Sequence, residues 1–520
     1  MRSALPEAAE SVTTPDSGGR PGPRSARFWY FPAGVAAVST VVFALAKPHL
    51  IDDTYITLSY AKNLAMHGHW GLIADGVANT ATSPMNVLSL AALTLVLRDA
   101  VIAAAVLFVL AQVLLALGLR RLGDRIGLPN WFAPLAVALT TINPLLISSI
   151  GLEIALGAAA VVWALVFATE RRPVALGLVL GVLALIRLDL LVMALVIFVA
   201  RRSFWTGIWR TFFAALAVAG PWFTISWFAL GSAVPDTVII KTLQRSWGEW
   251  SFTNGPLLYF RDYPAQTVLS FLPVVLAGML VLLWLALLVR GSDTARRILP
   301  FGVLALAGFA HYLAYAWLNV PPYHWYYGPS IAATTVFLAA AVASVDGEAF
   351  RQRVLAGAGL VGTAVVAAVA VAVYLAPGLP RQYAPLTSNH AASEQYLEIG
   401  EQLAQVAQGR KVHSAGEIGA LAYACDCPIV DLFSDRGAVA PAIAESESRA
   451  SALGKALIDL NFRFFDHSIA PADTDLVLEV THDAPPPTAL ASWTISSPWS
   501  GTQQLYLVSA ANARPTGQPW

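Results

Sequence analysis

Charged residues are scarce in this sequence. Asp, Glu, Lys and Arg make up 12% of its 520 residues, whereas soluble domains carry about 25%. Hydrophobic residues make up 57%, and the mean hydropathy is +0.62. Apolar runs long enough to cross about 30 Å of hydrocarbon recur from Trp29 to Ala376. The sequence therefore predicts an α-helical polytopic membrane protein and excludes an ordinary soluble globular domain.

The net charge and the number of cysteines are also low, and each of these two facts excludes a class of protein. The formal net charge is zero, so no basic field points to a nucleic-acid partner. Two cysteines, Cys425 and Cys427, are too few for a disulfide framework. Their spacing favours two thiols or a local bridge, and the further ligands of a zinc site are missing.

The N-terminal segment 1–27 is rich in Ser, Pro, Gly and Arg and has no apolar face. We expect it to be a disordered cytoplasmic tail. Arg20, Arg24 and Arg27 precede the first apolar run, which has no small-residue cleavage site. This run is therefore expected to be a plasma-membrane anchor that leaves the N-terminus in the cytoplasm.

Basic clusters fix the number of spans, because each cluster should face the cytoplasm. The apolar run Met85–Leu97 is short for a span, and counting it would turn the cluster at Arg120–Arg125 outward. We expect it to be an interfacial or re-entrant helix in a first outer loop, 51–100. The transmembrane domain, 28–377, then has about 11 spans. They lie near 29–50, 101–119, 130–150, 152–169, 173–187, 189–200, 204–230, 265–289, 298–318, 328–344 and 354–376.

Residues 378–520 contain acids, amides and prolines and no run of span length. The pattern over 411–414, 417–425 and 428–432 predicts a strand, a short helix and a strand. Because the predicted number of spans is odd and the N-terminus is expected in the cytoplasm, this segment is expected outside the cell. We expect a small extracytoplasmic soluble α/β domain.

Two adjacent acids, Asp52 and Asp53, follow directly after the first span. Acids at the edge of a membrane are costly to desolvate and usually have a function or a partner. A helix cap for 54–66 is the structural alternative. The same topology places further polar residues on the outer side: Glu153, Arg187, Asp189, Lys241, and the run 321–327 that includes Tyr323 and His324.

These outer residues have structural explanations as well as a functional one. Arg187 and Asp189 can pair across a turn, Glu153 can form an ion pair, and the aromatic run can be an interfacial belt. Taken together, however, the cations Arg187, Lys241 and His324 suit the phosphate of a lipid. A nearby carboxylate pair suits removal of a proton from an attacking hydroxyl. This combination favours sugar transfer from a lipid phosphate carrier.

The first outer loop contains an ordered series of motifs, and further motifs follow as far as residue 435. The sequence resembles the GT-C glycosyltransferase superfamily, and within it the terminal β-arabinofuranosyltransferases of mycobacterial and corynebacterial cell walls. The motifs that carry the resemblance are Asp52-Asp53-Thr54-Tyr55-Ile56, Tyr60-Ala61-Lys62-Asn63-Leu64, Gly68-His69-Trp70-Gly71-Leu72, Thr82-Ser83-Pro84, Gly151-Leu152-Glu153, Leu185-Ile186-Arg187, Pro235-Asp236-Thr237 with Lys241, Gly416-Glu417-Ile418-Gly419-Ala420 and Val430-Asp431-Leu432. One position departs from the family pattern: Leu188 replaces a proline.

The resemblance implies a polyprenyl-phosphate sugar donor, with arabinofuranose as the sugar, and a cell-wall glycan acceptor such as arabinogalactan. It implies that Asp52 and Asp53 are the catalytic carboxylates. The donor phosphate would be bound by Arg187, Lys241 and His324. The residues expected to position the substrates are Glu153, Asp189, Tyr55, Thr82, Ser83 and Tyr323.

Several alternatives stay open at this point. Another GT-C sugar, such as mannose, fits the same motifs. A lipid-linked sugar transporter or flippase would need midplane polar residues and repeat symmetry, and the sequence shows no repeat. An outer domain that binds glycan without turnover is a third alternative. Hard carboxylates also allow Mg²⁺ or Mn²⁺ at the acid pair, although the sequence requires no metal or other cofactor.

Overall fold

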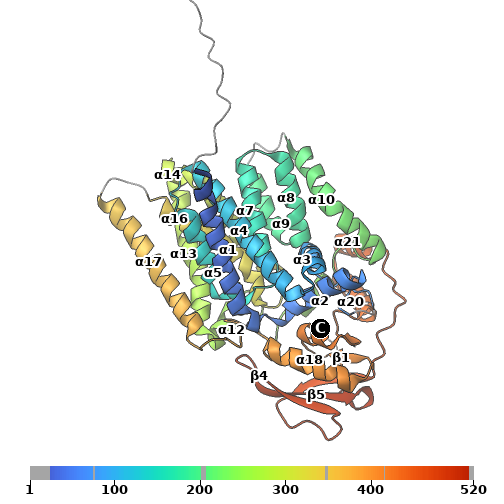
Figure 1. Cartoon of the computed structure of the whole chain (residues 1–520). Helices are drawn as coiled ribbons and strands as arrows, with labels where there is room; N and C mark the ends of the chain where they lie inside the picture. The colour runs from blue at the N-terminus through green and yellow to red at the C-terminus, as the bar shows by residue number, and fades with distance from the viewer. Residues whose placement is uncertain (1–23, 74–75, 201–206, 346–349, 415, 515–520) are drawn as a thin grey trace, which may run out of the picture.

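The computed structural model describes residues 24–73, 76–200, 207–345, 350–414 and 416–514. A bundle of helices forms one part of the molecule, and a small α/β domain packs against one end of it (Figure 1). The predicted fold class is therefore confirmed. Most of the predicted tail and the first residues of the span predicted near 204–230 lie outside the described residues.

Seven helical segments in the described part of the chain are long and apolar enough to cross a membrane. The helices concerned are α1 (Arg24–Ala46), α4 (Ala100–Ile126), α10 (Ile208–Ala229), α13 (Pro264–Val289), α15 (Leu299–Leu318), α16 (Gly328–Ala343, preceded by the 3-10 turn η3, His324–Tyr327) and α17 (Phe350–Leu375). Each corresponds to a predicted span.

Shorter apolar helices account for the other predicted spans. They are α5 (Phe132–Ile142), α7 (Ile154–Thr169), α8 (Pro173–Ile186) and α9 (Leu190–Ala200). The run expected to be interfacial is α3 (Pro84–Leu97). The total of about 11 spans stays a prediction, because these helices are shorter than a full crossing. The remaining helices of this part of the chain lie between the apolar ones. They are α2 (Asp52–His67), α6 (Pro144–Ser148), α11 (Thr237–Gln244), α12 (Gly255–Asp262), α14 (Asp293–Arg297) and the 3-10 turn η1 (Lys47–His49).

The span expected near 130–150 is broken into α5 and α6 at Asn143. Pro144 has no backbone N–H to continue the helix, and the Asn143 side chain accepts from the backbone N–H of Leu145 and Leu146. The neighbouring α13 satisfies further polar groups: the Asn143 side-chain amide donates to the Ser270 carbonyl, and Leu145 N–H donates to the Ser270 hydroxyl. A break inside the bundle is tolerated because a packed helix satisfies the polar groups that the break leaves free.

The C-terminal domain contains the predicted strand, helix and strand. These are β1 (Val412–Ser414), α19 (Gly419–Cys425) and β2 (Ile429–Val430). The sheet has the order β2-β1-β3-β5-β4; β1 is parallel to β2 and β3, and β5 is antiparallel to β3 and β4. The remaining elements are α18 (Ser393–Ala407), α20 (Arg436–Arg449), α21 (Ala452–Asn461), β3 (Leu476–Thr481), β4 (Ala491–Ser497), β5 (Gly501–Ser509) and the 3-10 turn η4 (Ala510–Asn512).

One apolar core joins the bundle to this domain. Leu58 of α2 and Val87 of α3 belong to the same buried cluster as Leu421 of α19, Leu476 of β3 and Leu507 of β5. The C-terminal domain is therefore packed onto the segment that follows the first span. Asp52 and other polar residues of the segment 51–100 lie at this junction.

Candidate active site

Asp52 is bound by the backbone of the C-terminal domain. One carboxylate oxygen accepts from the N–H groups of Ile418 and Gly419 at 3.2 and 2.8 Å, and the other accepts from Ala420 at 2.8 Å. These N–H groups lie at the start of α19, where they have no partner within the helix. Asp52 therefore joins the first turn of α2 to the first turn of α19.

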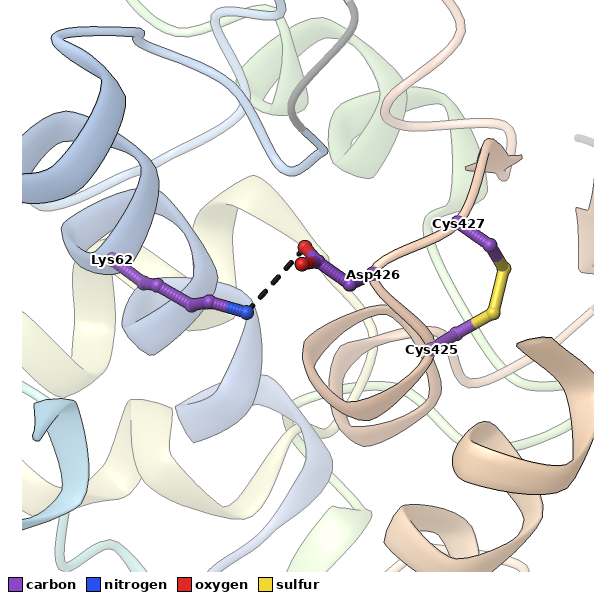
Figure 2. The surroundings of a disulfide bond; sticks show 4 residues. All are labelled: Lys62, Cys425, Asp426 and Cys427. Carbon is purple, nitrogen blue, oxygen red and sulfur yellow. Dashed lines mark ion pairs between the residues drawn. A yellow bond between two sulfur atoms is a disulfide. The ribbon is translucent and has the colours of Figure 1, made fainter. Parts of the chain in front are cut away.

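The two helices are also joined near their other ends. The Lys62 ammonium lies 3.4 Å from a carboxylate oxygen of Asp426, and Asp426 stands between the disulfide-bonded Cys425 and Cys427. Figure 2 shows Lys62 reaching from α2 to Asp426 beside this disulfide. The Lys62 side chain is partly exposed and that of Asp426 is exposed, so the ion pair contributes about 0–1 kcal/mol. The buried contact at Asp52 is the stronger of the two.

Two glycines let neighbouring segments pack closely against the first turn of α2. A Cβ at Gly419 would overlap the carbonyl oxygen of Asp52, and a Cβ at Gly151 would overlap the Thr54 side chain. Gly151 also has a φ of +96°, in the region that favours glycine. The direction of α2 at the two acids is therefore fixed by backbone packing.

Asp53 differs from its neighbour in its surroundings. It is half-buried, and its carboxylate forms no hydrogen bond or ion pair with another described residue. Burial raises the pKa of Asp53; the Lys241 ammonium lowers it, and the carboxylates of Glu153 and Asp431 raise it. A carboxylate with a raised pKa and open oxygens is suited to accept a proton.

The pKa of Asp52 is also raised, by burial first and then by the carboxylate of Glu417. The backbone N–H groups of Ala420 and Gly419 lower it in part. Amide donors bind both oxygens and fill three of the roughly four acceptor positions of the carboxylate, so this group is held against α19. The two adjacent acids therefore have different surroundings, which the sequence did not distinguish.

Lys241 lies on α11 over aromatic rings. Its ammonium is 4.6 Å from the ring centre of Tyr323, 5.7 Å from that of Tyr326 and 5.9 Å from that of Trp325. Aromatic faces attract a cation weakly, by about 0.5–2 kcal/mol. In the described part of the chain the ammonium makes no ion pair with a carboxylate. Lys241 is therefore a cation whose strong donors are available to an anion.

Arg187 is held on several sides. Its guanidinium donates to Glu153 and to Asp189, each at 2.8 Å, and to the hydroxyl of Tyr315 at 2.6 Å. Its side chain is 8% exposed. The pairing of Arg187 with Asp189, foreseen as the structural alternative, is thus present, and it extends to Glu153. The predicted phosphate-binding role of Arg187 stays a prediction.

This network includes His311 and Tyr315, which were not among the site residues predicted from the sequence. The Asp189 carboxylate also lies 2.8 Å from Nε2 of His311, whose Nδ1 lies 3.2 Å from the Ser330 hydroxyl. His311 and Tyr315 lie inside the span predicted near 298–318. A histidine in the middle of an apolar span was the available signal, because such residues face the interior of a bundle and have partners there.

The other predicted positions lie in different surroundings. Tyr55 packs edge-on against Tyr423 at the junction of α2 and α19, with ring centres 5.4 Å apart. Thr82 is exposed, and Ser83 is buried at the start of α3. His324 is 1% exposed and packs against Tyr259 and Trp325. Tyr323 is the predicted substrate-positioning residue that contacts Lys241, because the Lys241 ammonium lies over its ring.

Two carboxylates of the C-terminal domain complete the surroundings. Glu417 accepts from the side-chain amide of Asn389 and from the His390 backbone N–H. Asp431 accepts from the hydroxyl and the backbone N–H of Ser434. Burial raises the pKa of both. Glu417 accepts hydrogen bonds on both oxygens, and Asp431 accepts on Oδ1, whereas Asp53 accepts on neither oxygen from another described residue. Among the described residues no group of three or more His, Cys, Asp and Glu side chains is arranged to hold a metal ion.

Comparison with known proteins gives the fold. No protein-family model matches the sequence, and no curated protein matches it. The crystal structure of ArnT from Cupriavidus metallidurans bound to undecaprenyl phosphate matches with a TM-score of 0.52 and 16% identity, over 94% of this chain and 100% of ArnT. ArnT is a GT-C glycosyltransferase. The chain has the GT-C fold.

Two further structures match. The apo structure of the same ArnT has a TM-score of 0.52 and 15% identity, over 95% of this chain and 100% of ArnT. The arabinofuranosyltransferase AftD from Mycobacteria has a TM-score of 0.47 and 13% identity, over 87% of this chain and 35% of AftD. The two ArnT structures, each with a TM-score of 0.52, confirm the GT-C fold implied by the first-loop motifs, while the roles of individual residues stay predictions.

The contact between α2 and α19 can be tested at Gly419. In the Gly419→Ala variant the new methyl group would overlap the backbone of Asp52. We expect it to lower the free energy of unfolding by about 1–3 kcal/mol, seen as a lower thermal midpoint of the purified protein. Gly416→Ala is the matched control, because no atom lies within 4 Å of its added methyl group.

Asp52→Asn gives a second measure of the same contact, because the amide keeps the volume but offers one acceptor oxygen in place of two. It should also lower the thermal midpoint. An unchanged midpoint in both Gly419→Ala and Asp52→Asn would show that this contact does not hold the domain.

Proposed function

We propose that this chain is a membrane glycosyltransferase that moves arabinofuranose from a polyprenyl-phosphate donor to an extracytoplasmic cell-wall glycan. The observation that carries the proposal is the pairing of an open carboxylate, Asp53, with a nearby cation, Lys241, that has no carboxylate partner in the described part of the chain. The match to ArnT, which was solved with undecaprenyl phosphate bound, supports a lipid-phosphate ligand for this fold.

On the donor side, Lys241 binds the phosphate. When the donor binds, the ammonium exchanges its weak contacts with aromatic faces for a stronger, charge-assisted hydrogen bond to a phosphate oxygen. As the bond between the anomeric carbon and the phosphate oxygen breaks, the electron pair stays with the polyprenyl phosphate. A cation beside that oxygen stabilises the developing negative charge, so the leaving group needs no general acid.

On the acceptor side, Asp53 is the base. A hydroxyl of the glycan attacks the anomeric carbon, and its proton passes to a carboxylate oxygen of Asp53. Asp52 acts as a positioning residue through its hydrogen bonds to α19. Arg187 forms ion pairs with Glu153 and Asp189, whereas Asp53 keeps both carboxylate oxygens free of hydrogen bonds and ion pairs with the described residues. His324 has no step in this mechanism because its ring is buried among aromatic side chains.

The site is proposed to face the extracytoplasmic side. The Cys425–Cys427 disulfide belongs to the same domain, and disulfides persist in oxidising compartments. Arg296 and Arg297 lie on α14, at the end of the bundle opposite to the sheet (Figure 1). Basic residues concentrate on the cytoplasmic side, so both observations favour the same orientation.

Arabinofuranose is favoured by the ordered motifs of the first outer loop, and mannose is the second candidate. Purified protein in nanodiscs, given labelled polyprenyl-phosphate arabinofuranose or polyprenyl-phosphate mannose with a cell-wall glycan, distinguishes them. Transfer of arabinofuranose alone supports the proposal. Movement of intact lipid-linked sugar between leaflets without transfer would favour a flippase instead.

Replacing the proposed base gives the sharpest loss of activity. Asp53→Asn keeps the size of the side chain but removes its basicity, so we expect the turnover rate to fall about 100- to 10,000-fold. The thermal midpoint should stay at the wild-type value, because no hydrogen bond of the described residues is lost. Near-wild-type transfer by this variant would contradict the assignment of Asp53.

Lys241→Met retains the aromatic contacts and removes the charge. We expect kcat/KM for the donor to fall about 10- to 100-fold, the range of a hydrogen bond to a charged group. Because Lys241 lowers the pKa of Asp53, its loss raises that pKa further. A base is active only when ionised, so the acidic limb of the pH–rate profile should move to higher pH.

The matched control for this variant is Lys62→Met. Lys62 is a partly exposed lysine whose ion pair with Asp426 is weak, so its loss should change neither donor kinetics nor the acidic limb. An unchanged acidic limb in Lys241→Met would place Lys241 away from the base.

A further inference from the structure

Helix α21, Ala452–Asn461, exposes a row of apolar side chains. Leu453 is 71% exposed, Leu457 57% and Leu460 52%, and Phe464 beyond the helix is 44% exposed. Residues spaced by three and four positions share one face of a helix. Leaving this face in water would forgo about 25 cal/mol for each Å² of apolar surface that could be covered. A covering partner is therefore expected.

The other faces of α21 have different surroundings. Ile458 packs against the core formed by α11 and α20. Lys455 and Asp459 are exposed and, at 100° per residue, lie on the side away from the leucines. An amphipathic helix with a leucine face and charged residues opposite is typical of a helix that lies in a membrane interface.

The neighbouring helix α10 marks where that interface lies. It is one of the candidate spans and is only 11% buried over its apolar window. Aromatic side chains gather near its two ends, with Trp209 and Phe212 at one and Trp227 and Phe228 at the other. A rise of 1.5 Å per residue separates Trp209 from Trp227 by about 27 Å, close to the thickness of the hydrocarbon core. Aromatic belts of this kind lie at membrane surfaces.

α21 lies level with the second of these belts. The Trp227 indole N–H donates to the Leu460 carbonyl at 2.8 Å. The Phe464 ring is 4.6 Å from that of Phe228 and 5.0 Å from that of Trp227, centre to centre. Figure 1 shows α21 at the end of α10 that is nearer the C-terminal domain. The exposed leucines are thus continuous with the exposed apolar surface of a membrane span.

We propose that α21 lies in the membrane interface and inserts Leu453, Leu457, Leu460 and Phe464 among the lipid acyl chains. The partner is the bilayer itself, because the exposed face continues a surface that lipid covers. Lys455 and Asp459 remain in the aqueous phase. The C-terminal domain is then attached to the bilayer at a second place, apart from the helical bundle.

The membrane contact of α21 affects the position of the proposed active site. Ile240 and Leu243 of α11 share a buried core with Val439 and Ile443 of α20 and with Phe462, which follows α21. The bilayer contact therefore sets the height of α11, and with it that of Lys241, above the membrane. This consequence, unlike the insertion itself, rests on the proposed function, because it places the cation at the depth of a lipid phosphate.

Single-cysteine labelling tests the insertion directly. The two native cysteines form a disulfide, so a nitroxide can be attached at one introduced cysteine in the full-length chain. The test variants are Leu453→Cys, Leu457→Cys and Leu460→Cys, and the matched controls on the same helix are Lys455→Cys and Asp459→Cys. Each is reconstituted in phospholipid nanodiscs, and the collision rates with oxygen and with a water-soluble nickel chelate are measured.

Insertion predicts a several-fold higher ratio of oxygen to nickel collisions at the leucine positions than at 455 and 459, because oxygen concentrates in the acyl chains. Equal nickel access on both faces would show that α21 lies in water and would overturn the proposal. Protection of the leucine positions from both reagents would reveal a protein partner and would also overturn it. The readout involves no sugar transfer, so it is independent of whether the enzymatic proposal fails.

Discussion

The carboxylate of Asp52, bound to three backbone N–H groups at the start of α19, is the contact on which the rest of the candidate site depends. It links the residue that follows the first span to a helix more than 360 positions later. Since the contact is buried, losing one partner would leave a desolvated polar group without compensation. The direction of α2, and therefore the position of Asp53, follows from it.

Two adjacent acids thus have separate roles in the proposed enzyme. Successive residues of a helix point about 100° apart, so an acid that faces the C-terminal domain leaves its neighbour facing elsewhere. The charges of Lys241, Glu153 and Asp431 lie near enough to Asp53 to affect its pKa. The C-terminal domain supplies the donors that hold α2 and, through α20, the core behind α11. It is therefore part of the site and not only a cover over it.

Much of the fold could be predicted from the sequence, because membrane helices are specified by apolar length and by basic loops. The strand, helix and strand near 411–432 were also predictable from local periodicity. The break at Asn143 was not predicted, since it depends on the Ser270 carbonyl and hydroxyl of α13, which accept hydrogen bonds from Asn143 and Leu145 across the bundle. Similarly, nothing local to Asp52-Asp53 indicates which acid is bound by amides, because the donors are distant in sequence. His311 joins Asp189 through packing between helices that no local pattern reports.

The most direct measurement is a structure of the full-length chain in nanodiscs with undecaprenyl phosphate bound. We expect a phosphate oxygen about 3 Å from the Lys241 ammonium, with the carboxylate of Asp53 facing the site and Asp52 still bound to α19. A phosphate bound away from Lys241, or an Asp52 carboxylate released from α19 and turned toward the phosphate, would contradict it.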